Sequence, residues 1–139
     1  MSNFRFSKRS LKNLEGVHPD MVKLMKRTLA SSDIDFMIIC GLRTKEQQQV
    51  LYDTGKSQTL NSRHLTGHAV DIAVWIDGGI SWDPKYYKEI GRTALEQAAL
   101  CNIHTVWGGN WKHFKDYGHF ELDRHYYFED EPYKPLTNA

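Results

Sequence analysis

The 139-residue chain has little of several features that mark particular classes of protein. It contains no apolar run near the roughly 18 residues that a membrane-spanning helix requires, so we expect no transmembrane segment. Lysine and arginine number 18 against 17 aspartates and glutamates. This even balance argues against nucleic acid as a partner, because nucleic-acid-binding domains carry a clear basic excess. Residues 1–10 lack the apolar stretch of a signal peptide, so we expect synthesis in a cytoplasm.

Cysteine and proline are also scarce, with two and four residues respectively. Cys40 and Cys101 both lie in apolar segments. We favour two buried free thiols there, and a disulfide stays the alternative. The sequence shows no repeats, no low-complexity tract and no linker. Its length therefore predicts a single domain, residues 1–139, which we expect to be a monomer.

Apolar residues at helical spacing predict helices over residues 19–31, 45–54 and 84–101. Thr44 and Asp83 are suited to cap the second and third of these helices. Short β-rich runs predict strands at the following residues: 36–40, 69–75, 104–107 and 118–122. We expect the first strand to be buried on both faces or nearly so. The prediction is an α+β fold, a small and mainly antiparallel sheet with helices packed on one side.

The most informative stretch is Ser-Arg-His-Leu-Thr-Gly-His-Ala-Val-Asp, residues 62–71. His64, His68 and Asp71 are residue types that bind zinc, and a catalytic zinc usually has three protein ligands. In a strand, Asp71 faces away from His68, while Gly67 permits a turn that returns His64 toward Asp71. We therefore interpret His64 and Asp71 as ligands and His68 as a supporting or structural residue. A helical His-Glu-x-x-His site is disfavoured, because Gly67 and the β-branched run argue against a helix and position 65 is not Glu.

A second stretch, residues 116–122, again places an acid, a glycine and a histidine before an alternating strand. His119 can complete the ligand set. Asp116 could reach a metal-bound water without being a ligand itself. Glu121 shares a face with His119, so it either orients that ligand or is an exposed strand carboxylate.

Ser62-x-His64-x-x-Gly67-x-Ala69-x-Asp71 followed by Asp116-x-x-His119 resembles the zinc motif pair of the D-Ala-D-Ala-type metallopeptidases. That group contains D-alanyl-D-alanine carboxypeptidases and dipeptidases, and the short phage endolysins that cut L-alanyl-D-glutamate bonds in peptidoglycan. The Hedgehog signalling domain shares the fold. The run Gly41-Leu42-Arg43-Thr44, with Gln48 after it, resembles a third block of the family. The likeness covers about residues 36–122 and is closest to the phage endolysins.

The resemblance implies one Zn²⁺ held by three residues, His64, Asp71 and His119. It also implies that Asp116 is the general base and that Arg43 binds an oxyanion or a substrate carboxylate. Ser62 is expected to orient the histidine loop or touch substrate, and Gln48 to support Arg43. Three aromatic residues either line a groove or pack in the core: Trp107, Trp111 and Tyr117. Packing in the core is the commoner role of aromatic residues in a small domain.

Three functions remain open. The first is an endopeptidase that cuts the L-Ala–D-Glu bond of the peptidoglycan stem peptide, acting on the wall after release from the host cytoplasm. The second is a D,D-carboxypeptidase or D-Ala-D-Ala dipeptidase, and the third is a noncatalytic zinc domain that binds a partner. Asp116 and Arg43 argue against the third. The carboxylate-poor segment 108–117 gives no reason to expect calcium regulation, since calcium takes six to eight oxygen ligands.

Overall fold

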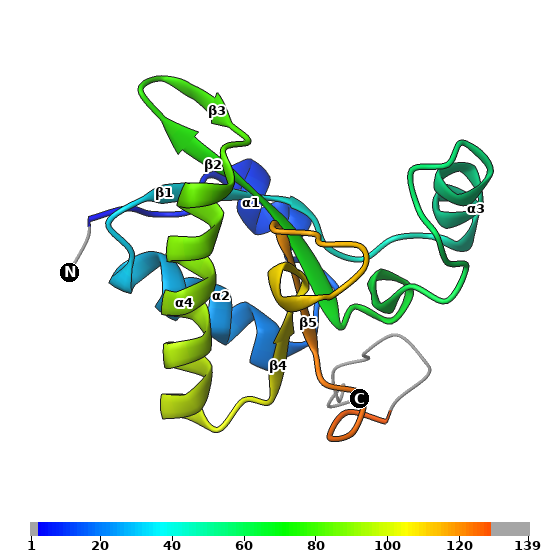
Figure 1. Ribbon diagram of the computed structural model, residues 1–139. Helices are drawn as coiled ribbons and strands as arrows, with labels where there is room; N and C mark the ends of the chain where they lie inside the picture. The colour runs from blue at the N-terminus through cyan, green and yellow to red at the C-terminus, as the bar shows by residue number, and fades with distance from the viewer. Residues whose placement is uncertain (1–2, 129–139) are drawn as a thin grey trace.

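A computed structural model describes residues 3–128. Its centre is a five-stranded antiparallel sheet with the strand order β1-β2-β5-β4, in which β3 pairs with the far end of β2 (Figure 1). The strands are β1 (Asp35–Cys40), β2 (Ala69–Ile76), β3 (Gly79–Ser81), β4 (Thr105–Trp107) and β5 (His119–Leu122). The helices are α1 (Lys8–Asn13), α2 (Pro19–Ser31), α3 (Lys45–Asp53) and α4 (Pro84–Cys101), with 3₁₀ turns η1 (Arg63–Thr66) and η2 (Gly108–Asn110). The predicted α+β fold is confirmed.

The predicted helix starts are confirmed by their capping contacts. The Thr44 side chain accepts from the Gln47 backbone, and the Gln47 side chain returns a contact to the Thr44 backbone. Asp83 accepts from the Lys85 N–H, with proline directly after the cap. Such caps satisfy N–H groups that have no partner inside the helix.

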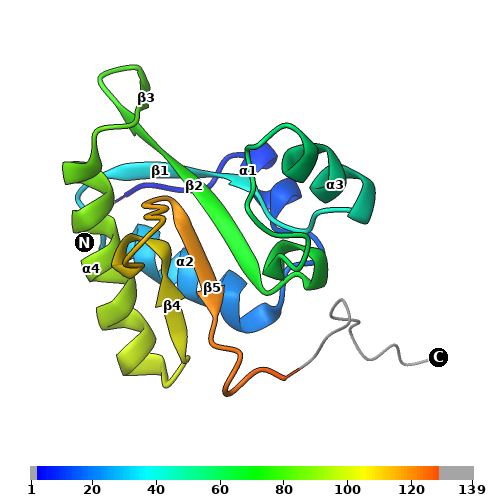
Figure 2. The ribbon, with the colours of Figure 1, turned by 45° about the vertical axis from the view of Figure 1, so that its right-hand side comes forward.

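One face of β2 contributes to the hydrophobic core. Val70, Ile72 and Val74 lie in a buried cluster with the apolar stripes of α2 and α4. Because side chains alternate along a strand, Asp71 stands on the opposite face. Helix α3 lies away from this core, on the far side of the molecule from α4 (Figures 1 and 2).

The expectation that the first strand is buried on both faces is wrong. Only Phe36 and Ile38 of β1 are buried, and Ile39 is 38% exposed. The reason is that β1 packs on the core with one face: Phe36 and Ile38 belong to the buried cluster, and the residues that alternate with them do not.

A β-bulge at the end of β1 changes which face its last residue presents. Ile38 pairs with Ile72, but the next pair along is Cys40 with Asp71, so Ile39 is an extra residue in the ladder. A bulge of this kind redirects the side chains that follow it. Cys40 is therefore set opposite Asp71 instead of continuing the core face of Phe36 and Ile38.

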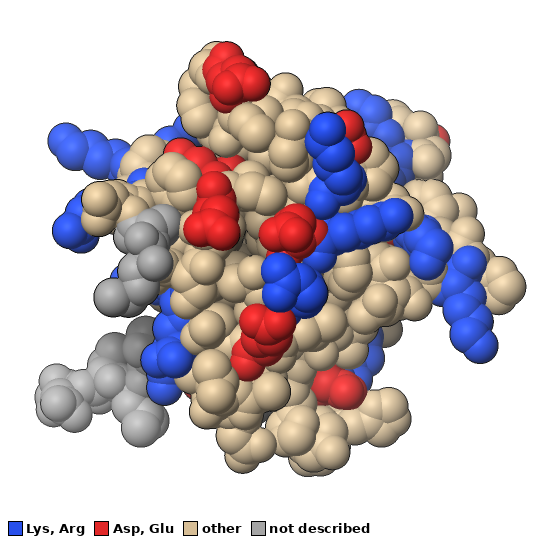
Figure 3. Space-filling view, turned by 60° about the vertical axis from the view of Figure 1, so that its left-hand side comes forward, with Lys and Arg blue, Asp and Glu red and all other residues tan. Residues whose placement is uncertain are grey.

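Two further features concern the surface. Acidic and basic side chains are interspersed on the face seen in Figure 3, and on α4 Arg92 forms ion pairs with Glu89 and Glu96. Within residues 3–128, no helix is both long enough and apolar enough to cross a membrane.

Candidate metal centre

Three separate elements bring the predicted ligands together. Asp71 on β2 and His119 on β5 are direct partners across the two strands. His64 lies on η1, which ends at Gly67 in the left-handed conformation with φ of 76°. That conformation favours glycine, and it allows the chain to turn from His64 into β2, as predicted.

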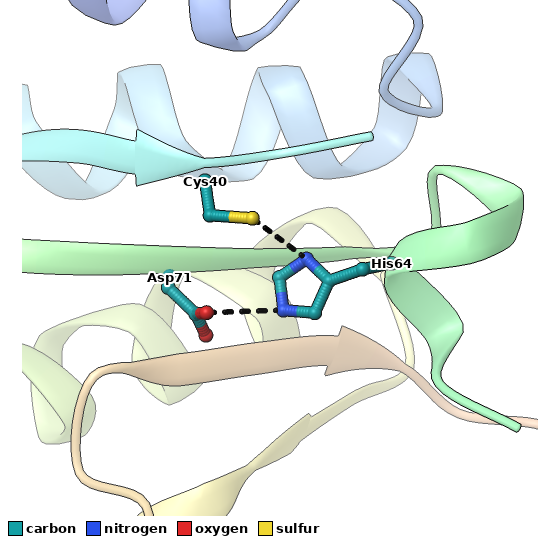
Figure 4. Close-up of side chains that lie close together, drawn as sticks. All are labelled: Cys40, His64 and Asp71. Atoms are coloured by element: carbon teal, nitrogen blue, oxygen red, sulfur yellow. Dashed lines mark hydrogen bonds and ion pairs between the residues drawn. The ribbon is translucent and has the colours of Figure 1, made fainter. Parts of the chain in front are cut away.

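The Asp71 carboxylate lies between the two imidazoles. Its Oδ2 is 3.2 Å from Nε2 of His64, and its Oδ1 is 3.0 Å from Nδ1 of His119. The centroids of the two histidine rings are 5.1 Å apart. Figure 4 shows His64 and Asp71 facing each other.

The hydrogen bonds of His64 identify which ring nitrogen is free to bind a cation. Its Nδ1 lies 2.8 Å from the Gly41 carbonyl oxygen, which only accepts, so Nδ1 carries the proton. Nε2 is buried and forms no hydrogen bond of good geometry within the described residues, although Asp71 is beside it. A nitrogen lone pair and a carboxylate in contact require a proton or a metal ion between them. The Nε2 of His64 beside the Asp71 carboxylate therefore fits a bound metal ion.

His119 repeats the arrangement with its nitrogens exchanged. Its Nε2 lies 2.8 Å from Oε1 of Glu121, which leaves Nδ1 directed at Asp71. A carboxylate on the second nitrogen orients a ligating histidine and makes it more basic. This contact assigns Glu121 a supporting position beside the cluster.

The electrostatics of the metal-free cluster favour a positive charge at this place. Burial opposes a charged imidazole, but the Asp71 carboxylate outweighs it and raises the pKa of His64 to about 10. Burial is likewise outweighed at His119, where contacts with Asp71 and Glu121 raise the pKa to about 9. The histidines in turn hold the pKa of Asp71 below its usual range, against the effect of burial. A metal would take the place of these protons.

Cys40 is part of the cluster, and sequence reasoning missed it. The ligand atoms of Cys40, His64 and Asp71 lie within 4.8 Å of one another, as do those of Asp71, Asp116 and His119. The Cys40 Sγ is 3.7 Å from Nδ1 of His64, on the opposite edge of the ring from Asp71 (Figure 4). Both cysteines are free, as expected, but each is only partly buried.

Asp116 lies in the loop before β5, beside the predicted ligands. Its backbone N–H donates to the Gly108 carbonyl at 3.0 Å, which holds the loop against η2. Burial and then the charge of Asp71 raise the pKa of Asp116. A raised pKa makes a carboxylate a stronger base, which suits it to accept a proton from a nearby group.

Arg43 borders the cluster from the other side. Its Nη1 donates to Oε1 of Gln48 at 2.7 Å, and its Nη2 lies 3.2 Å from the Cys40 Sγ and 3.6 Å from Oδ2 of Asp71. Gln48 is buried and donates to Oγ of Ser57 at 2.9 Å and to the Thr59 carbonyl at 2.6 Å. Gln48 thus joins Arg43 to the loop that leads to η1.

The other two predicted residues lie farther from the ligand atoms. Ser62 caps η1, and its Oγ accepts from the His64 N–H at 3.2 Å, so it helps to place that histidine. His68 is buried with its Nδ1 2.7 Å from Oγ1 of Thr66, and it belongs to neither ligand group.

A cavity of about 470 Å³ opens over the cluster, within the size range of small-molecule sites. All three predicted ligands line it. Arg43, Asp116 and Glu121 line it as well. Trp111 also lines it, whereas Trp107 is a core residue and Tyr117 packs against the core. The arrangement can hold a cation, place a proton-transfer group beside it and admit a small peptide.

Comparisons with known proteins agree with this geometry. Residues 1–133 match the pattern of the phage L-alanyl-D-glutamate peptidase family. The chain is 35% identical over 126 residues to the L-alanyl-D-glutamate peptidase of Escherichia phage T5, covering 88% of this chain and 91% of that protein. It is 34% identical over 111 residues to the peptidoglycan L-alanyl-D-glutamate endopeptidase CwlK of Bacillus subtilis (strain 168). This match covers 70% of this chain and 66% of that protein.

A solved structure extends the likeness to three dimensions. The crystal structure of the Serratia marcescens L-Ala D-Glu endopeptidase ChiX matches with a TM-score of 0.85 and 43% identity, over 91% of this chain and 95% of that one. Since the family pattern covers nearly the whole chain and the fold agrees, this protein belongs to the phage L-alanyl-D-glutamate peptidase family.

Proposed function

We propose that the protein is a zinc-dependent endopeptidase that hydrolyses the L-Ala–D-Glu bond of the peptidoglycan stem peptide. The observation that carries this proposal is the Asp71 carboxylate set between His64 and His119, with Asp116 in contact range, inside a cavity. The names of the relatives supply the bond that is cut.

His64, Asp71 and His119 would hold the ion, through two nitrogens and a carboxylate of the kinds that zinc binds. When bound there, zinc supplies a Lewis acid that activates water and polarises a peptide carbonyl. Gly41 and Glu121 keep the two histidines in the tautomers that leave a lone pair directed at Asp71.

The proton and the developing negative charge need residues of their own. Asp116 takes the proton of the attacking water and delivers it to the leaving amine. The guanidinium of Arg43 lies near Asp71. Its planar, charged group stabilises the oxygen of the carbonyl under attack. A single chain supplies every residue of this arrangement, which accords with action as a monomer.

The biological role that we propose is that of a phage endolysin, made in the host cytoplasm and acting on the wall after release. A D,D-carboxypeptidase or D-Ala-D-Ala dipeptidase is the alternative with the same chemistry. A noncatalytic zinc domain would have no use for Asp116 and Arg43 in the positions described.

Mass spectrometry of purified peptidoglycan after digestion tests the proposal. We expect fragments with a new N-terminal D-Glu, and none from a matched digest by the Asp116→Asn variant. Loss of a terminal D-Ala alone would replace the proposal with the D,D-carboxypeptidase. An unchanged wall after digestion with zinc-loaded protein would refute peptidoglycan hydrolysis.

A further inference from the structure

Charged side chains of both signs line the cavity. The acidic ones all lie at the end where the predicted metal ligands are. Asp71 and Glu121 contact the His119 nitrogens, and Asp116 belongs to the same ligand group. Two of the four cations are also engaged. Arg43 donates to Gln48, and the buried Arg63 donates to the Tyr127 carbonyl at 2.9 Å.

The two remaining cations, Lys56 and Arg124, are exposed on the cavity lining. Within residues 3–128, neither of them pairs with a carboxylate. Arg124 uses one donor, from Nη2 to the Asn61 carbonyl at 3.0 Å, of the five that a guanidinium has. Both side chains therefore have hydrogen-bonding capacity for an anion.

Both cations are connected to one loop, residues 55–62: Lys56 belongs to it and Arg124 contacts it. At its beginning, the backbone N–H of Lys56 donates to the Leu51 carbonyl at 2.8 Å. In its middle, Gln48 holds the residues at positions 57 and 59. Near its end, the Asn61 carbonyl accepts the contact from Arg124. The loop is thus tied down at three points, one of which also supports Arg43.

We propose that Lys56 and Arg124 form a subsite for the free carboxylate of the D-Glu residue that follows the bond being cut. The inference rests on the proposed function. Glutamate has two carboxyl groups, and when one of them continues the peptide the other stays anionic close to the leaving amine. Arg43 lies beside Asp71 and is already assigned to the oxygen of the carbonyl under attack, so the free carboxylate needs other cations.

A pair of substrates that differ in one group tests the subsite. The first is the stem tripeptide L-Ala-D-Glu-L-Lys joined through the side-chain carboxyl of D-Glu, and the second carries an amide in place of the free carboxylate. The zinc-loaded parent should cut the first with a kcat/KM at least about tenfold higher, the size of a hydrogen bond between charged groups. High salt should reduce this preference, since both cations are exposed.

Lys56→Met and Arg124→Met should each lose most of the preference, through a higher KM for the carboxylate substrate. Their kcat/KM for the amidated substrate should change far less than their kcat/KM for the carboxylate substrate. Lys56→Arg should retain the preference. The matched control is Lys45→Met, which removes an exposed cation of α3 outside the cavity lining and should behave as the parent.

Three results would overturn the subsite. The parent could cut both peptides equally well, or the Met variants could lose activity on both in equal proportion, which would indicate a structural role. Cleavage of neither peptide by zinc-loaded parent would refute the proposed function itself, and the subsite with it. The first two results leave the proposed endopeptidase intact.

Discussion

At the scale of single residues, Arg43 contacts three residues around the cluster: Gln48, Cys40 and Asp71. A guanidinium can contact several groups at once because its donors are held in a planar fork, whereas a lysine ammonium is a point charge. The position of Arg43 therefore depends on geometry as well as on charge.

Arg43→Lys should leave the fold intact and lower turnover by about a hundredfold or more, the usual effect of losing one donor to a developing oxyanion. Arg43→Ala should be at least as damaging. Hydrolysis of wall peptide, measured alongside thermal melts, checks this. If both variants cut at the parent rate, Arg43 is only a cation on the cavity wall.

Asp116 is expected to move a proton without holding the metal. Asp116→Asn keeps the shape of the side chain, so it should retain zinc and near-parent stability. It should lose activity by about 10²–10⁴, the size of a general acid–base contribution. His119→Ala should lose zinc first and activity as a consequence, and elemental analysis separates the two classes of variant.

A folded but zinc-free Asp116→Asn protein would make Asp116 a ligand, and the role of base would pass to Glu121. A zinc-loaded and fully active one would show that another group transfers the proton.

The grouping of His64 with Asp71 could be anticipated at this scale because the two residues are close in sequence. His64 and Asp71 are separated by a short loop with Gly67 in it, and His119 opens a recognisable strand. Cys40 could not be placed in the same way. Its side chain joins the cluster through a bulge, and a bulge depends on the pairing of β1 with β2.

At the scale of elements, the turn from η1 into β2 determines where His64 lies. Gly67 and Gly55 both have φ of 76°, so alanine at either should cost about 1–2 kcal/mol of left-handed strain. They differ in their surroundings. A Cβ at Gly67 would overlap the Gly16 carbonyl oxygen, whereas nothing lies within 4 Å of one at Gly55.

Gly67→Ala should therefore lower the free energy of unfolding by about 1–3 kcal/mol more than Gly55→Ala does, the typical cost of overpacking. It should also weaken zinc binding, because the backbone next to His64 must move. Urea denaturation of both variants measures the difference. Equal losses would show that the contact with Gly16 relaxes without cost.

The helices could also be anticipated, since periodicity and caps such as Thr44 and Asp83 are local signals. The burial of β1 could not, because it depends on which parts of the folded chain pack on each face of the sheet. Nor could the contacts of Gln48 with positions 57 and 59, which are made between a helix and a loop that only the folded chain brings together.

At the scale of the whole molecule, the metal would join η1, β2 and β5 in one contact, so it should bind the folded chain and not the unfolded one. With free zinc at 100 times its dissociation constant, this linkage stabilises by about 2.7 kcal/mol. Removing zinc with a chelator should then lower the Tm by roughly 5–15 °C. The matched control is His119→Ala, whose Tm should not respond to the chelator. An equal response would mean that zinc stabilises the fold from another site.

The most direct test of a single zinc centre that hydrolyses peptide is a titration of zinc into metal-free protein. Bound zinc and release of N-terminal D-Glu from the stem peptide are measured on the same samples. Hydrolysis should be absent at the start, rise in proportion to bound zinc and stop rising at about one ion per chain. Full hydrolysis by the metal-free protein, or zinc bound to one equivalent without any new N-terminal D-Glu, would contradict the account.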